Sequence, residues 1–323
     1  MFTNFGKDRH SAWRDKEQKE RESHARLDVI VAGLIAISRE KDLTYLNDID
    51  EEKVVRSLLK VHSIEMIEAI KTASLGSTEG KTTVTRFDLE PDASYAPIDS
   101  ETYYSALYSS DSAIQAAEAL RSGKRISYSI SRPPGHHAGR NFYHGFCYFN
   151  NAAVAAETLK VGGKKVAILD IDVHHGDGTQ DIFYDDQDVF FSSLHADPNI
   201  ILPHTGKSEE RGTGKGFGST LNLPLPIGIN VENYKKVLYS ALEAIYNFQP
   251  SYLVLSAGFD THKFEKRHLP PLTQLDTQDY LSLGEIIGSL NIPICVILEG
   301  GYNTELLGDS FIKLIQGLEN DRN

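Results

Sequence analysis

Residues 166–179 read Val-Ala-Ile-Leu-Asp-Ile-Asp-Val-His-His-Gly-Asp-Gly-Thr, an apolar run that leads directly into carboxylates and imidazoles. The first four residues have the aliphatic composition of a strand that is covered on both faces. Residues two apart in a strand share a face, so Asp170, Asp172 and His174 are expected to point the same way. One such residue is usually just a solvated polar group, but burying all of them requires a metal ion or counter-charges. The stretch therefore predicts a buried strand that ends at a metal site.

Strands and helices alternate on both sides of this stretch. Strands are predicted at residues 125–131, 166–169, 189–194, 252–256 and 294–298, and helices at residues 26–37, 51–73, 111–123, 151–159, 231–248, 277–290 and 304–318. Residues 75–100 are predicted to form a loop. Strands separated by helices pair in parallel, so the expected fold class is α/β, with an open, mostly parallel sheet and helices on both faces.

Length and composition favour one soluble catalytic domain. The 323 residues contain no low-complexity linker and no fixed-period repeat, so residues 26–323 are expected to form one domain. Residues 1–25 are expected to form a charged arm or exposed helix, and no chemistry is expected at residues 7–28. The net charge of −12 argues against nucleic-acid binding and favours cationic substrates. With two cysteines, no CxxC pair and neither a signal peptide nor a spanning segment, a cytoplasmic protein without membrane association is expected.

Polar residues of catalytic type follow each of the five predicted strands. In chain order they are His136 and His137, then Asp170, Asp172, His174 and Asp177, then His195, then Asp260, and finally Glu299 and Tyr302. Ligands bind beyond the carboxyl ends of the strands in an open parallel sheet, so these side chains are expected to converge there.

A catalytic zinc ion takes three protein ligands and keeps one position open. Asp172 and His174, with Asp260 from another strand end, satisfy that count. His and carboxylate ligands also accept ferrous iron, so the sequence is compatible with zinc or iron.

The remaining polar residues are suited to moving protons. His136 and His137 follow a Pro-Pro-Gly turn and can handle protons near neutral pH, while Asp170 and Asp177 can orient their rings. Tyr302 follows two glycines and can aim a phenol at a polarised carbonyl group.

The sequence resembles the zinc-dependent histone deacetylases and the acetylpolyamine amidohydrolases, from about residue 61 to residue 319. The motifs that carry the resemblance are Arg132-Pro-Pro-Gly-His-His-Ala-Gly, Gly145-Phe-Cys-Tyr-Phe-Asn-Asn, Asp170-Ile-Asp-Val-His-His-Gly-Asp-Gly-Thr-Gln, Ser256-Ala-Gly-Phe-Asp and Glu299-Gly-Gly-Tyr-Asn. The resemblance implies an arginase/deacetylase-like fold. It also implies hydrolysis of an acetyl or other small acyl group from acylated lysine, in a peptide or protein, or from an acylated small amine.

The resemblance also implies roles for individual residues. Asp172, His174 and Asp260 would bind zinc; His137 would be the general base, with His136 as its electrostatic neighbour; Tyr302 would donate to the oxyanion; and Asp170 and Asp177 would lie behind the histidines. A structural potassium ion is implied near the backbone around Asp170, Asp172 and His174 and near Ser193 and Leu194. Gly145 and Phe146 match one wall of the substrate channel, and Leu202 stands where the other wall usually carries an aromatic residue.

Two further departures from the family pattern follow. After Asp260 the chain reads Thr-His-Lys263-Phe-Glu-Lys-Arg-His-Leu-Pro-Pro in place of a Gly-Asp-Pro-like turn, and the family's first strand is not recognisable before Arg26. The rim of the site is therefore expected to differ from that of typical members.

Three alternative functions remain open. A polyamine-specific amidohydrolase is disfavoured, because residues 75–100 look shorter than the insertion that narrows the entrance of such enzymes. A two-metal enzyme of arginase type would need a further Asp-x-Asp pair, but Asp260 stands alone before Thr261-His-Lys. A catalytically silent module that binds acylated lysine would lack Tyr302 or a histidine, and these are present. The sequence leaves the oligomeric state open.

Overall fold

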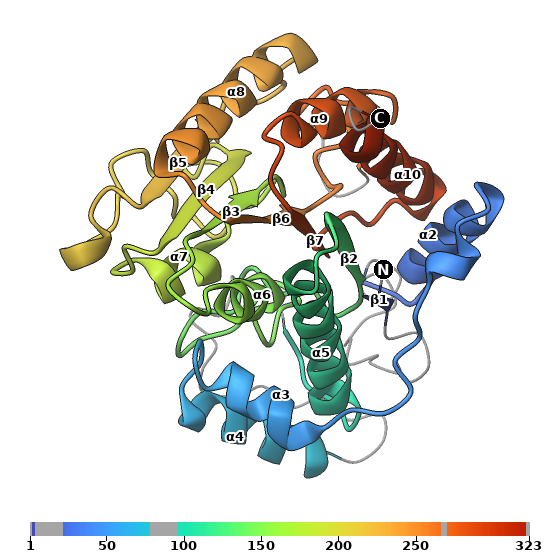
Figure 1. Ribbon diagram of the computed structural model, residues 1–323, viewed down its shortest axis with the longest axis vertical. Coiled ribbons are helices and arrows are strands. Elements are labelled where there is room, and N and C mark those ends of the chain that lie inside the picture. Colours follow the sequence, from blue (N-terminus) through green and yellow to red (C-terminus); the bar gives the residue numbers. More distant parts are fainter. Residues whose placement is uncertain (1, 4–21, 78–95, 266–269, 321–323) are drawn as a thin grey trace.

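The structure, a computed structural model, describes residues 2–3, 22–77, 96–265 and 270–320. Its strands form a seven-stranded sheet within these residues, in the order β1-β2-β7-β6-β3-β4-β5, and every neighbouring pair is parallel (Figure 1). The strands are β1 (Phe2–Thr3), β2 (Ile126–Ile130), β3 (Val166–Asp170), β4 (Val189–Ala196), β5 (Thr220–Leu225), β6 (Tyr252–Ala257) and β7 (Ile294–Leu298). The predicted α/β fold with an open parallel sheet is confirmed.

Helices cover both faces of this sheet. One side carries α3 (Glu51–Leu58), α4 (Ile64–Leu75), α5 (Thr102–Arg121) and α6 (Asn151–Leu159), and the other carries α2 (Ala25–Ala36), α8 (Val231–Phe248), α9 (Asp279–Gly288) and α10 (Thr304–Asn320) (Figure 1). The short α7 (Asp177–Phe183) follows β3, and η1 (Glu40–Asp42) and η2 (Gly214–Gly216) are single 3-10 turns. None of the helices in the described part of the chain combines the length and the apolar composition needed to span a bilayer.

The side chains of the interior strand β3 alternate between two cores. Val166 and Ile168 pack into the core formed with α3 to α6, whereas Ala167 and Leu169 pack into the core formed with α2, α8, α9 and α10. A parallel strand covered on both faces needs apolar residues at every position, which explains the uninterrupted run. The polar residues begin where this double cover ends.

Helices with clear capping residues match their predicted bounds. The Asn150 side chain accepts a hydrogen bond from the Ala153 backbone at the start of α6, and Asn230 accepts one from Asn233 at the start of α8. Both helices begin where predicted because these caps stand directly before helical periodicity. The other strands and helices named above lie within two residues of their predicted bounds, apart from the cases that follow.

Several predicted bounds were wrong. Residues 51–73 form two helices, because Ser63 begins α4 by accepting from the Met66 backbone. Helix α5 begins at Thr102 instead of residue 111, and α7, β1 and β5 were not predicted. Strand β3 ends at Asp170, so Asp172 and His174 do not share a strand face with it.

Two predictions concern residues that are only partly described. Residues 4–21 of the expected arm and residues 78–95 of the expected loop lie outside the described part of the chain.

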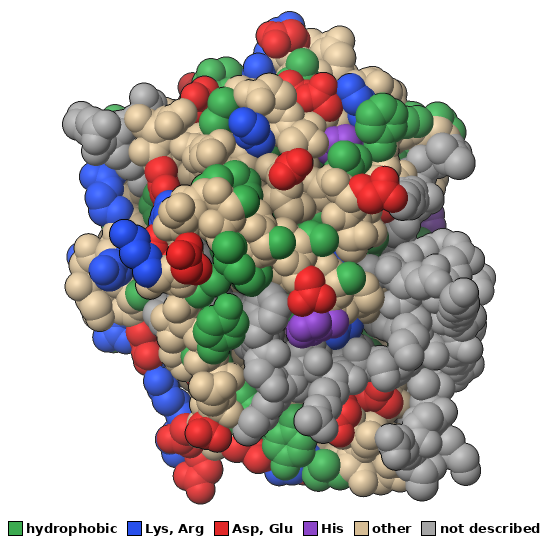
Figure 2. Space-filling view, turned by 90° about the vertical axis from the view of Figure 1, so that its right-hand side faces the viewer, with side chains coloured by type: hydrophobic (Ala, Val, Ile, Leu, Met, Phe, Trp, Pro, Cys, Tyr) green, Lys and Arg blue, Asp and Glu red, His purple; other side chains and the backbone are tan. Residues whose placement is uncertain are grey.

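On the face shown in Figure 2, acidic side chains are scattered, whereas lysines and arginines gather mainly along one edge and at the top.

Candidate active site

Three ligand-type side chains converge beyond β3 and β6. Oδ1 of Asp172 lies 3.0 Å from Nδ1 of His174, which lies 3.0 Å from Oδ2 of Asp260. Tight turns after β3 produce this arrangement: Asp170 accepts the backbone N–H of Asp172 at 3.0 Å, and Asp172 accepts that of His174 at 2.9 Å. All three side chains are buried. The convergence therefore comes from turn geometry and not from a shared strand face.

The three residues fit a divalent metal ion. Oδ2 of Asp260 is buried and makes no well-aligned hydrogen bond within the described residues, because Nδ1 of His174, 3.0 Å away, is shared with Oδ1 of Asp172. Ligand atoms around a tetrahedral zinc ion lie about 3.3 Å apart, close to the spacing of these atoms. Glycine at position 300 leaves space beside the two carboxylates, because a Cβ there would lie 2.5 Å from Asp172 Oδ2 and 2.8 Å from Asp260 Oδ2. Two carboxylates and one imidazole are a donor set that zinc and iron both accept.

His137 has the environment of a neutral base. Its Nδ1 lies 2.7 Å from Oδ1 of Asp177, the first residue of α7. Burial alone would raise the pKa of Asp177, but His144 and His137 outweigh it and hold this pKa far below its ordinary value. An ionised carboxylate only accepts, so Nδ1 of His137 carries the proton and Nε2 of the neutral ring is unprotonated. Burial and the neighbouring His136 keep the pKa of His137 well below its usual value.

His136 has the opposite tendency. Its ring centroid lies 4.0 Å from that of His137, and its Nδ1 lies 3.0 Å from Oδ2 of Asp170. Burial disfavours a charged ring, but the carboxylates of Asp172 and Asp170 outweigh it and raise the pKa of His136 well above its usual value. The two adjacent imidazoles are thus suited to different tasks, one electrostatic and one basic.

Tyr302 lies on the turn after β7. Its ring packs edge-to-face on Phe146 at 5.4 Å, and its backbone N–H donates to Oε2 of Glu265 at 2.9 Å. Gly145 has a φ of 56°, and a Cβ there would lie 2.4 Å from Cδ2 of His137. Only glycine lets the backbone before Phe146 lie this close to the imidazole.

Two further residues named in the sequence analysis belong to β4 and the segment after it. Leu202, joined to Pro203 by a cis peptide bond, is 41% exposed. His195 contacts the carbonyl oxygen of Gly206 at 2.9 Å, and its ring lies 4.6 Å from that of His175. Leu202 as a wall of the substrate channel stays a prediction.

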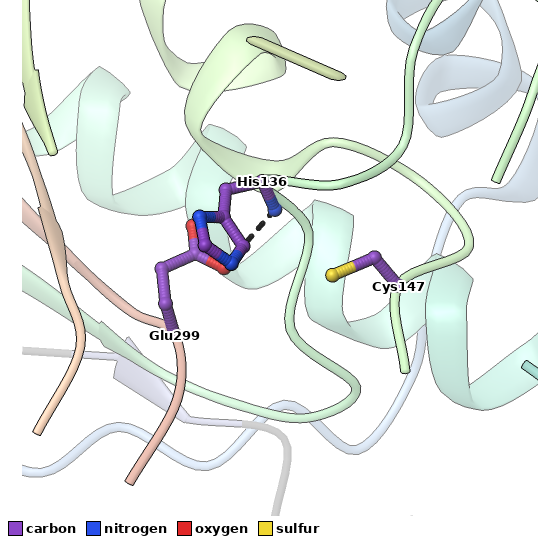
Figure 3. A group of neighbouring side chains, drawn as sticks. All are labelled: His136, Cys147 and Glu299. Atoms are coloured by element: carbon purple, nitrogen blue, oxygen red, sulfur yellow. Dashed lines mark hydrogen bonds between the residues drawn. The ribbon is translucent and has the colours of Figure 1, made fainter. Parts of the chain in front are cut away.

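Glu299 is a part of the site to which the sequence assigned no role. Its Oε2 accepts the backbone N–H groups of Gly135 at 2.8 Å and of His136 at 3.2 Å, and Figure 3 draws the second of these bonds. Ser256 Oγ donates to Oε1 at 3.2 Å. The next residue, Gly300, donates its N–H to Oδ2 of Asp172 at 2.9 Å. Burial raises the pKa of Glu299 to about 7. A glutamate placed directly after a buried apolar strand was the available sequence signal.

A buried network of ion pairs supports the turn that carries Gly301 and Tyr302. Arg26 Nε donates to the carbonyl oxygen of Gly301 at 2.7 Å, and the Arg26 guanidinium carbon lies 4.9 Å from the centre of the Tyr302 ring. Glu22 accepts from Arg26 at 3.1 Å and from Arg132 at 3.0 Å. These contacts of Arg26 support the turn and are not chemistry, so the expectation of no chemistry at residues 7–28 stays a prediction for Arg26. Its place in phase with the buried residues of α2 was the signal that could have revealed it.

Known proteins are similar to this chain in sequence and in fold. The histone deacetylase domain family matches residues 20–318. Acetylpolyamine amidohydrolase 1 of Pseudomonas aeruginosa is 42% identical over 228 residues, which cover 69% of this chain and 64% of that protein, less than two thirds of its length. The acetylpolyamine amidohydrolase of Mycoplana ramosa is 36% identical over 287 residues, covering 82% and 83% of the two chains. A solved structure of an acetylpolyamine aminohydrolase from Burkholderia pseudomallei matches with a TM-score of 0.86 and 29% identity over 98% of both chains.

Proposed function

Because the chain belongs to the histone deacetylase domain family, whose members depend on a metal ion, we propose that it is a zinc-dependent amidohydrolase that removes an acetyl or other small acyl group from an acylated amine. One observation carries the proposal: the ligand atoms of Asp172, His174 and Asp260 converge beside a neutral imidazole, since the His137 and His174 ring centroids are 5.9 Å apart. A metal and a base so close together suit hydrolysis by an activated water.

Asp172, His174 and Asp260 would hold the metal ion, which is zinc in this proposal, with ferrous iron as the alternative. The bound ion supplies Lewis acidity, by which it polarises the amide carbonyl group and makes a water molecule nucleophilic near neutral pH. Gly300 and Gly258 keep side-chain atoms away from Asp172, whose Oδ2 would lie 2.5 Å and 2.2 Å from a Cβ at these two positions.

The chain's own residues would handle the protons. His137 takes a proton from the attacking water at Nε2, and its Nδ1–H bond to Asp177 stabilises the resulting imidazolium. It then gives this proton to the amide nitrogen, so that the C–N bond breaks and the amine leaves as a neutral group. Tyr302 donates its phenolic hydrogen to the carbonyl oxygen as that oxygen gains negative charge. His136, paired with Asp170, adds positive charge beside the reacting group.

The identity of the amine has two candidates. An N-acetylated polyamine is favoured by the names of the relatives from Pseudomonas and Mycoplana and by the net charge of −12, which suits a cationic substrate. Acylated lysine in a peptide is the broader candidate, predicted from the family motifs. The sequence argument against polyamines concerned residues 75–100, of which 78–95 lie outside the described residues. The potassium ion near Asp170 and Ser193, the cytoplasmic location and Leu202 as a channel wall stay predictions.

Turnover of matched substrates by the zinc-loaded and the iron-loaded protein tests the proposal. The substrates are an acetyl-lysine peptide, N-acetylputrescine, N-acetylspermidine, and lysine peptides with longer acyl chains. Preference for the small amines would support the polyamine candidate, and preference for a peptide would support a protein deacylase. A His137→Ala variant is the control that assigns the turnover to this site. No turnover of any substrate with metal bound would reject an amidohydrolase and favour a silent acyl-lysine-binding module.

A further inference from the structure

A third histidine contacts the carboxylate that lies behind the proposed base. Nε2 of His144 lies 2.7 Å from Oδ2 of Asp177, while Nδ1 of His137 lies 2.7 Å from Oδ1 of the same residue. Each carboxylate oxygen thus has one imidazole nitrogen as its partner. All three side chains are buried. The sequence predicted that Asp170 and Asp177 orient the rings of His136 and His137 and assigned no role to His144, so His144 is an addition to the site.

The two contacts must both be hydrogen bonds that the imidazoles donate. Asp177 is ionised and accepts at both oxygens, so protons lie on Nε2 of His144 and on Nδ1 of His137. Separations of 2.7 Å are typical of charge-assisted hydrogen bonds. The same three residues would bind a metal ion only if His137 lost its Nδ1 proton and with it this hydrogen bond. The observed geometry therefore favours a hydrogen-bonded unit over a second metal site.

The ring of His144 lies nearly parallel to two neighbouring rings. It lies 5.9 Å from the Phe142 ring at an interplanar angle of 19°, and 4.8 Å from the His137 ring at 28°. His144 also directly precedes Gly145 and Phe146, the predicted channel wall. His144 thus contacts the Asp177 carboxylate and the His137 ring, and it directly precedes the predicted channel wall in the sequence.

We propose that His144 is a positioning residue for the amide hydrolysis: by donating to Oδ2 it fixes the Asp177 carboxylate, which in turn fixes the ring plane and tautomer of His137. A carboxylate with one partner can rotate about its Cβ–Cγ bond, whereas one with a donor at each oxygen is held in a single orientation. His137 then presents its unprotonated Nε2 to the reaction and its Nδ1–H to Asp177. The inference rests on the proposed function, because His144 itself contacts no substrate in it.

Two variants separate hydrogen bonding from packing. His144→Phe keeps an aromatic ring between Phe142 and His137 but has no donor, whereas His144→Gln keeps an N–H donor but loses the ring. We expect His144→Phe to lower kcat by about 10- to 100-fold with little change in KM or metal content, as for other groups that orient a reacting side chain. His144→Gln should recover most of the lost kcat. Wild-type kcat in His144→Phe, or an equal loss in both variants, would overturn the proposal.

A double-mutant cycle tests the route through Asp177. If His144 acts only by holding this carboxylate, His144→Phe should add little to the loss caused by Asp177→Asn, because both changes break the same unit. Independent losses that multiply in the double variant would show that His144 acts in another way and would overturn the proposal.

NMR of the metal-free protein supplies a readout that needs no turnover. Imidazole N–H groups bonded to a carboxylate exchange slowly with water and resonate far downfield, so His144 and His137 should each give one such signal, apart from the signal of His136 bonded to Asp170. His144→Phe should remove one of them and shift the other, which belongs to His137; an unshifted second signal would overturn the coupling. If the wild type hydrolyses no acylated amine, the proposed function fails by itself. If it does hydrolyse one and His144→Phe matches it, only this inference fails.

Discussion

The backbone N–H of His136 donates to Oε2 of Glu299 at 3.2 Å, so the loop that carries both site histidines is held by the end of β7. Gly135 donates to the same oxygen at 2.8 Å. Glu299→Ala leaves both buried N–H groups without this acceptor, at about 1–3 kcal/mol for each group. We expect the free energy of unfolding of the metal-free protein to fall by about 2–4 kcal/mol, measured with denaturant. Glu299→Gln keeps an acceptor oxygen and should lose less than half as much; equal losses would assign the effect to packing.

The difference in unfolding free energy between the wild type and Glu299→Gln should depend on pH, and the pKa of Glu299 sets the direction of that dependence. Burial raises the pKa of Glu299 from 4.5 to about 7, so between these values the folded state binds more protons than the unfolded state. Stability from this group is therefore greatest below the unfolded pKa and falls as the pH rises through the folded pKa. Between pH 4.5 and 7, the unfolding free energy of the wild type relative to Glu299→Gln should fall by up to about 3 kcal/mol. A constant difference across this range would mean that the three donors keep the carboxylate ionised.

The residue types after β3 made the metal-type ligands predictable. Asp172 and His174 are close in sequence, and Asp260 follows another strand of the same parallel sheet, so topology alone brings them to one edge. The turn that actually points them together was not predictable in the same way. It depends on hydrogen bonds from the backbone of residues 172 and 174 to preceding carboxylates, which compete with continued strand structure.

The supporting residues escaped prediction for a different reason. The contact between Glu299 and His136 requires β7 to lie beside β2, which is a matter of strand order and not of local pattern. The direction of His144 depends on the backbone at Gly145 and Phe146, both of which have positive φ. Arg26 reads as an ordinary polar residue at the start of a helix until its partners across the molecule are known.

Removal of one ligand tests the metal site directly. Asp172→Ala should leave the protein without bound metal after dialysis, because two ligands bind zinc far more weakly than three. Metal analysis of the purified variant measures this. Asp276→Ala, which changes a surface carboxylate paired with Lys263, is the control and should retain its metal. Full metal content in the Asp172 variant would remove that residue from the ligand set.

Tyr302→Phe removes one hydroxyl group and leaves the ring against Phe146. If the phenol donates to the developing oxyanion, kcat should fall by about a hundredfold or more, while metal content and thermal stability stay close to those of the wild type. Steady-state kinetics on the preferred substrate measures the loss. Turnover near the wild-type value would exclude Tyr302 from the mechanism.

Glu265 should affect turnover through Tyr302. It stands in the segment that replaces the Gly-Asp-Pro-like turn of the family, and it accepts the Tyr302 backbone N–H at 2.9 Å, while Asn303 donates to the carbonyl oxygen of Phe264 at 2.9 Å. Glu265→Ala should loosen this turn and lower kcat by about 10-fold or more, whereas Glu265→Gln, which still accepts, should lose less.

Glu265→Ala introduced into the Tyr302→Phe variant should have little further effect on kcat, because the hydroxyl group that the turn positions is already absent. Kinetics of the single and double variants measure this coupling. If Glu265→Ala lowers kcat by the same factor in the wild type and in Tyr302→Phe, Glu265 has a role apart from Tyr302. If Glu265→Ala lowers kcat in the wild type but not in Tyr302→Phe, a carboxylate from this chain's own variant of the loop after Asp260 positions the oxyanion donor.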